Sequence, residues 1–129
     1  MKFDQALGIH EQALKLRARR AEVLAGNIAN VDTPGYQARD FDFHAMLQQE
    51  VGASQRVQTT HPRHIQLDAG IVPPSQMGYR VPSQPSLDDN TVDSQLEHAA
   101  FASNALEYQA SLRFVSGRIR SLMTAIKGQ

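Results

Sequence analysis

Apolar residues recur at alternating spacings of four and three near the amino terminus of the chain. This row contains Phe3, Leu7, His10, Leu14, Arg17, Ala21, Leu24, Ile28 and Val31. Seven of the nine positions are apolar, which gives a narrow heptad stripe rather than the broad apolar face of an ordinary globular helix. The pattern therefore predicts a long helix whose partner is another helix.

The carboxyl-terminal end repeats the pattern. Its first row comprises Phe101, Ala105, Tyr108, Leu112, Val115, Ile119, Leu122 and Ile126, and a second row comprises Val92, Leu96, Ala99, Ser103, Leu106 and Ala110. We expect Asn90 or Thr91 to cap this helix, or Ser94 through a capping box with Glu97. Because one face is enough to pair with the first helix, the second row predicts contacts with helices of other chains.

These rows predict an all-α protein in which long N- and C-terminal helices pair as a coiled coil. The residues expected to make the pairing are Leu7, Leu14, Leu24, Ile28, Leu112, Val115, Ile119 and Leu122. Aromatic residues are only 6% of the chain, so we expect a thin core and a marginally stable monomer. A monomeric two-helix hairpin is the simpler alternative.

The middle of the chain is rich in proline. Five of the six prolines lie between residues 51 and 90, which excludes a long helix through most of this segment. Extended pieces at 57–60, 64–67 and 79–81 would form a small β-ribbon or lie as ordered loops. We therefore divide one structural domain into residues 1–36, a helix and turn; 37–90, an extended or irregular middle; and 91–129, the second helix.

Composition narrows the function classes. The 129 residues carry 13 basic and 13 acidic side chains, so no overall field favours nucleic acid or an acidic membrane. Cysteine is absent, and no apolar run approaches the roughly 18 residues of a membrane span. The first residues interrupt any apolar run with polar ones and do not read as a cleaved signal peptide.

Candidate chemistry is sparse. His61 and His64 are three residues apart, but Pro62 disfavours a helix that would align them on a metal. Residues 88–93 resemble the start of a calcium loop without its glycine or final glutamate. No serine has a nucleophile-elbow setting and no glycine-rich phosphate loop occurs. We therefore expect no catalytic, cofactor-binding or metal-binding residues and no small-molecule substrate.

A basic cluster offers an alternative from another class. Four cations within six residues, Lys15, Arg17, Arg19 and Arg20, could bind the phosphates of a nucleic acid. Glu11 and Glu22 flank the cluster and aromatic stacking residues are missing, which favours a solvated helix face instead.

The most informative stretch is GNIANVDTPGY, residues 26–36. Pro34 and Gly35 suit the central positions of a type II turn, so the helix must end there. Asn27 and Asn30 lie three apart on a face beside the apolar stripe, where their amides can bind the last helical carbonyls or the backbone of a neighbouring chain.

This stretch resembles the amino-terminal signature of the flagellar rod and hook axial proteins, in which a long helix ends in an Asn-x-x-Asn-x-x-Thr-x-Gly-Tyr turn. The matching positions here are Asn27, Asn30, Thr33, Gly35 and Tyr36. Residues 37–43, 79–82, 85–88, 90–93 and 103–110 are similar to the proximal rod subunits of that group. Gly26 and Asp89 depart from the pattern. The group often has serine, alanine or asparagine at the position of Gly26, and glycine at the position of Asp89.

The resemblance implies a structural building block of the proximal rod in the flagellar basal body. It also implies that the chain is exported unfolded through the type III apparatus without a cleaved signal peptide, and that it is located in the periplasmic space. Implied partners are copies of itself, other rod subunits, the membrane-ring adaptor and the export gate. Phe43 and Leu47 resemble an export-gate element, although a short amphipathic turn explains them equally. Another rod subunit, of the FlgC type, is the alternative within the group.

Overall fold

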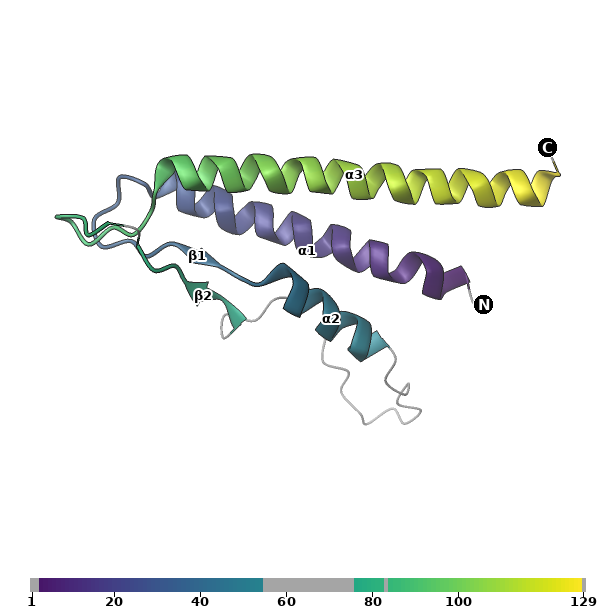
Figure 1. Ribbon diagram of the computed structural model, residues 1–129, viewed down its shortest axis with the longest axis horizontal. Coiled ribbons are helices and arrows are strands. Elements are labelled where there is room, and N and C mark those ends of the chain that lie inside the picture. The colour runs from purple at the N-terminus through teal and green to yellow at the C-terminus, as the bar shows by residue number, and fades with distance from the viewer. Residues whose placement is uncertain (1–2, 55–75, 83, 129) are drawn as a thin grey trace.

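Two long helices lie side by side in the computed structural model of the chain (Figure 1). α1 spans Phe3–Ala29 and α3 spans Ser94–Lys127. Asn27 contacts Glu97 near one end of the pair, and the His10 and Phe114 rings lie 4.5 Å apart toward the other, so the helices are antiparallel. The predicted fold class, all-α with long paired terminal helices, is confirmed.

The structure describes residues 3–54, 76–82 and 84–128, with side chains described from residue 8 to 51 in the first range. The extended pieces expected at 57–60 and 64–67, and the histidine pair His61 and His64, lie outside the described residues. The piece expected at 79–81 is described and contributes to a strand.

A third helix, α2, spans Phe43–Ser54. All of it lies within residues 37–90, which were expected to be extended or irregular, so that expectation is wrong for this stretch. Asp42 begins the helix by accepting hydrogen bonds from the backbone N–H groups of His44 and Ala45 at 2.9 and 3.1 Å. Packing against α1 stabilises a 12-residue helix that would be marginal alone.

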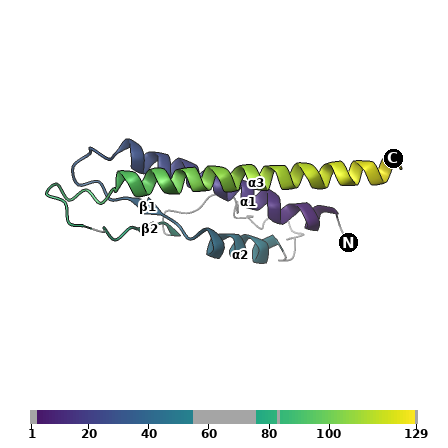
Figure 2. The same cartoon turned by 45° about the horizontal axis from the view of Figure 1, so that its top comes forward.

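A two-stranded antiparallel ribbon connects the middle of the chain to the helices. β1, Arg39–Asp40, pairs with β2, Gly78–Tyr79, so that Arg39 lies opposite Tyr79 and Asp40 opposite Gly78. Figure 1 shows α1 between α3 and α2, and Figure 2 shows the ribbon and α2 together along one side of the helix pair. The ribbon therefore lies beside the end at which α1 stops and α3 starts.

The apolar core lies between α1 and the segment that contains α2. Its buried members are Ala13, Leu16, Phe41, Phe43 and Met46, with Val23, Leu47 and Met77 packed against them. Ala13 and Leu16 are not in the heptad row read from the sequence. α1 has neighbours on two sides, so its buried surface extends beyond the single stripe that a two-helix pair would use.

The start of α3 differs from each cap expected from the sequence. Asp93 is the N-cap, and its carboxylate accepts from the backbone N–H groups of Gln95 and Leu96 at 3.1 and 3.2 Å. The side chains of Asn90 and Thr91 bind other parts of the chain, which leaves Asp93 to cap. Gly128, in left-handed conformation, ends the helix.

Candidate functional site

Asn27 is the centre of the predicted turn motif and is fully buried. Its amide nitrogen donates to the carbonyl of Arg39 at 2.7 Å and to the Glu97 carboxylate at 3.1 Å. Its amide oxygen accepts from the backbone N–H of Arg39 at 3.1 Å and from the Tyr36 hydroxyl at 3.4 Å. One side chain thus joins α1 to the β-ribbon and to α3.

The second amide of the motif acts locally. Asn30 donates to the carbonyl of Gly26 at 2.8 Å and accepts from the Thr33 hydroxyl at 3.1 Å. The chain then turns: the N–H of Tyr36 donates to the carbonyl of Thr33 at 3.2 Å, and Gly35 has φ 71°. A type II turn requires a positive φ at this position, which glycine adopts without strain.

Asn90 does not cap α3, the role predicted from the sequence, and instead binds the segment that follows α1. It is buried, and its amide nitrogen lies 3.1, 2.7 and 2.9 Å from the carbonyl oxygens of Asn30, Val31 and Thr33. These carbonyls follow the end of α1, where helical partners run out. Asn90 satisfies them from about 60 residues further along the chain, so no local sequence signal could have assigned this role.

The loop before α3 is fastened to the turn by further hydrogen bonds. Thr91 accepts from the backbone N–H of Ala38 at 2.8 Å, and the N–H of Gly35 donates to the carbonyl of Asp88 at 2.8 Å. Asp89 has φ 57°, a left-handed conformation that glycine adopts more easily than aspartate. This is the position at which the axial proteins often have glycine.

A charged network crosses the same region. Arg20 binds Asp40 through two hydrogen bonds of 3.1 and 2.9 Å. Arg80 bridges Asp40 at 2.7 Å and Glu97 at 2.6 Å, and Glu97 is only 1% exposed. The network joins α1, β1, the residue that follows β2, and α3. Within a buried region, such groups are tolerated only when each has a partner.

The network shifts the pKa of Asp40 and of Arg20. Burial acts to raise the pKa of Asp40, but hydrogen bonds from Arg20, Arg80 and the Phe41 N–H outweigh it, so the pKa of Asp40 is lowered. The hydrogen bond to Asp40 raises the pKa of Arg20 despite partial burial. Both residues therefore stay charged throughout the neutral range.

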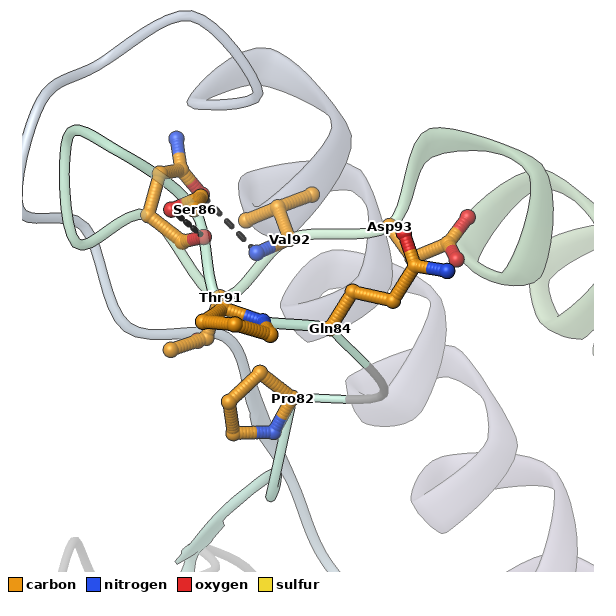
Figure 3. Close-up of a pocket in the computed structure, with 8 residues that line it drawn as sticks. Pro82, Gln84, Ser86, Thr91, Val92 and Asp93 are labelled. Atoms are coloured by element: carbon orange, nitrogen blue, oxygen red, sulfur yellow. Dashed lines mark hydrogen bonds between the residues drawn. The ribbon is translucent and has the colours of Figure 1, made fainter.

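We call this region the turn end: residues 27–41, 78–82 and 84–97. Its loop borders an open hollow of about 410 Å³, which is lined by Pro82, Gln84, Pro85, Ser86, Asn90, Thr91, Val92 and Asp93. Figure 3 shows the two hydrogen bonds that shape it, from the Ser86 hydroxyl to the carbonyl of Asn90 and from the Val92 N–H to the Asn90 amide oxygen, both 2.8 Å. These polar groups hold the loop together.

The residues expected to pair the helices differ in exposure. Leu24 is fully buried, whereas Leu112 and Ile119 remain 46% and 42% exposed. Half-buried positions are Leu14, Ile28, Val115 and Leu122, and Leu7 lies in the first turns of α1, where side chains are not described. Polar contacts also join the pair, because the buried Asn104 donates to the carbonyl of Arg17 at 2.9 Å.

The basic cluster is neutralised within the fold. Each of its four cations is paired with a carboxylate: Lys15 with Glu11, Arg17 with Glu107, Arg19 with Glu22 and Arg20 with Asp40. Arg17 also lies over the Phe43 ring, 4.2 Å from its centroid. Paired cations are poor phosphate ligands, so the geometry does not favour the nucleic-acid alternative.

Phe43 and Leu47, the candidate export element, lie in α2 and face the core. Phe43 is buried and Leu47 is partly buried against the same cluster. The folded chain therefore hides this element.

The described part of the chain holds no group of three or more His, Asp or Glu side chains placed to bind a metal ion. Among the helices described, none combines the length and apolar character that a membrane crossing requires.

Comparisons with known proteins give one consistent result. The family model described as flagella basal body rod protein matches residues 7–37, which include the whole amide turn. The flagellar basal body rod protein FlgB of Escherichia coli (strain K12) is 46% identical, covering 98% of this chain and 96% of the relative. FlgB of Salmonella typhimurium is 43% identical over the same shares, and FlgB of Cereibacter sphaeroides is 47% identical over 98% of both chains.

Proposed function

The chain belongs to the FlgB family of flagellar basal body rod proteins and is a structural subunit of the rod, and we propose that it polymerises through its terminal helices into the hollow, torque-transmitting axial structure of the proximal rod. The observation that carries the proposal is the second apolar row of α3. In that row Leu96 and Leu106 are 54% and 69% exposed in the single chain. Contact with neighbouring subunits would remove these side chains from water. Full burial of each one would stabilise the assembly by about 1.5 to 3 kcal/mol.

The turn motif has a supporting role in this proposal. Asn27 is used inside the chain, so it fixes the geometry of the turn end rather than touching a neighbour. Thr33, Pro34 and Gly35 are exposed and remain available for contacts with other subunits. The motif thus presents a rigid outer surface, which a subunit that transmits torque requires.

Location and partners follow from the family. We propose that the subunit resides in the periplasmic part of the basal body, contacts other rod subunits and the membrane-ring adaptor, and leaves the cell by type III export without cleavage of a signal peptide. Export as an unfolded chain would expose Phe43 and Leu47, which the folded core covers. In this proposal the gate reads the element before the chain folds. The subunit acts as a building block and not as an enzyme.

A genetic experiment tests the rod proposal. The gene is deleted in its source bacterium, and basal bodies are imaged by electron microscopy for rods above the membrane rings. We expect the wild-type gene to restore rods and swimming and Leu106→Asp to fail, because a charge would enter the subunit contact. Gln109→Asp, an exposed polar position on the same helix, is the matched control and should restore both.

Two results would contradict these expectations. Rods that persist in the deletion strain would remove the proposed role. Restoration of rods by Leu106→Asp would show that the second row of α3 does not carry the assembly contact.

A further inference from the structure

The second half of α3 forms a distinct surface, which we call the tail: residues 108–128. Several large apolar side chains in it are more than two-fifths exposed, namely Leu112, Phe114, Ile119, Met123 and Ile126. Figure 1 shows the last turns of α3, which end the tail, running beyond the start of α1. The tail therefore keeps a large part of its apolar surface exposed, although Phe114 contacts the His10 ring of α1.

The tail also carries only positively charged side chains. It contains Arg113, Arg118, Arg120 and Lys127 and no acidic residue. All four cations are exposed, and none has a carboxylate within ion-pair distance among residues 8–51, 76–82 and 84–128. This differs from the basic cluster of α1, in which every cation is paired.

The opposite end of the molecule carries the complementary charge. Residues 81–96 include Asp88, Asp89 and Asp93 and no lysine or arginine, and all three carboxylates are exposed. Leu87 projects fully into solvent beside them, and Val81 is 91% exposed. We call this loop, residues 81–82 and 84–93, the acidic tip. An apolar side chain flanked by acids is the counterpart of an apolar helix face flanked by bases.

We propose that the tail is a docking surface for the acidic tip of a second copy of this chain. The tip and the tail lie at opposite ends of the molecule (Figure 1), so a chain cannot satisfy its own tail. A contact between unlike surfaces of identical subunits is heterologous and continues from copy to copy. The inference deepens the proposed rod function and rests on it only for the expectation that copies assemble.

The two components of the contact have different physical roles. Opposite charges orient the approaching copies and raise the rate of encounter, an effect that salt weakens. Burial of Leu87 against the apolar stripe of the tail supplies attraction that salt does not screen. The proposal therefore predicts salt-sensitive association between ends, in addition to the helix contacts proposed for the second row of α3.

Charge reversal in both surfaces gives the test. The tail variant carries Arg113→Glu, Arg118→Glu and Arg120→Glu, and the tip variant carries Gln84→Lys, Asp88→Lys and Asp89→Lys. Association of the purified full chain is measured by sedimentation equilibrium at about 0.05 M and about 0.5 M NaCl, a range over which screening rises strongly. Lys15→Glu, an exposed cation outside both surfaces, is the control. Circular dichroism verifies that each variant is folded.

We expect the wild type and the control to associate at low salt, and at least about tenfold more weakly at high salt. Each reversed variant alone should associate at least about tenfold more weakly than the wild type at low salt, because its tip and tail then repel. An equal mixture of the two should associate again, since each reversed surface meets its complement. The tail variant changes exposed side chains without ion pairs, so it decides the question even if the tip variant fails to fold.

Three outcomes would overturn the proposal: a wild type that remains monomeric at all concentrations, association unchanged by tail reversal, or a mixture of two folded variants that associates no more strongly than each variant alone. None of these touches the rod function itself, which rod formation in the complemented deletion strain tests separately. Loss of rods with Leu106→Asp together with unchanged association of the tail variant would leave the rod proposal standing and reject the tip contact.

Discussion

The two ends of the helix pair differ in burial and in the pairing of their polar groups. At the turn end, buried polar groups from four elements bind one another, and Asn27, Asn90 and Glu97 are all at most 8% exposed. At the tail, α3 continues with several large apolar side chains partly exposed, and its cations have no carboxylate partner within the described chain. The turn end is thus fixed by polar contacts inside the chain, although Leu87 stays fully exposed there, whereas the tail has no comparable polar network.

The turn end depends on particular side chains more strongly than the apolar core does. Apolar burial near the middle of α1 is generic, because many side chains of similar volume fill such a core. The turn end instead depends on hydrogen bonds with fixed geometry, in which each missing partner leaves a buried group unsatisfied. Substitutions there should therefore have larger effects on the monomer than substitutions in the tail.

The largest expected effect comes from Glu97→Ala. The change removes the buried carboxylate that binds both Arg80 and Asn27, so that Arg80 keeps only Asp40 and the Asn27 nitrogen keeps only the Arg39 carbonyl. We therefore expect the free energy of unfolding to fall by about 3 kcal/mol. Urea unfolding followed by circular dichroism measures it. Arg120→Ala in the tail should change stability by less than about 0.5 kcal/mol. Equal effects of the two substitutions would remove the contrast between the ends.

Asn90→Ala should come next. It removes the amide nitrogen that lies near three carbonyls following α1. The Asn30 and Thr33 carbonyls keep the backbone N–H groups of Thr33 and Tyr36, so we expect the free energy of unfolding to fall by about 2 kcal/mol. Asn30→Ala, which loses one backbone contact at a half-buried site, should cost about 1 kcal/mol. The same urea unfolding ranks the two. A larger loss for Asn30 would mean that the local turn, and not the long-range contact, holds the end of α1.

Acid should loosen the turn end before the tail. The folded-state pKa of Asp40 is lowered, so its contribution to stability is fully present above its unfolded value of about 3.9 and is lost as pH falls through the lower folded value. Thermal unfolding between pH 7 and strongly acidic pH measures the loss, and Asp40→Asn should make the acid branch less steep. A steeper acid branch in this variant would contradict the assignment.

The smallest expected effect is a gain. Asp89→Gly relieves a left-handed backbone at the turn end but adds freedom to the unfolded chain, so the net stabilisation should be about 0.5 kcal/mol. Asp88→Gly, one residue earlier and without a positive φ, should instead destabilise by a similar amount. Melting temperatures of the two variants provide the check, and a loss of stability in Asp89→Gly would show that its side chain outweighs the strain.

Some features near the turn were predictable and their neighbours were not. Pro34 and Gly35 specify a turn because their backbone preferences act within four residues. The same stretch also indicated that Asn27 and Asn30 would bind backbone groups at a helix end. It could not indicate that Asn27 would reach Glu97, 70 positions away, or that Asn90 would serve the carbonyls of the first helix instead of capping the second.

By itself, the sequence determined the two long helices and the turn between the first helix and the middle, because hydrophobic periodicity and backbone preference are local properties. It also carried the family signature. Only the tertiary structure decided which face of α1 is buried, that Phe43–Ser54 forms a helix on it, and that Arg20, Asp40, Arg80 and Glu97 meet. Those outcomes depend on contacts between distant segments, whose free energy exists only once the chain brings them together.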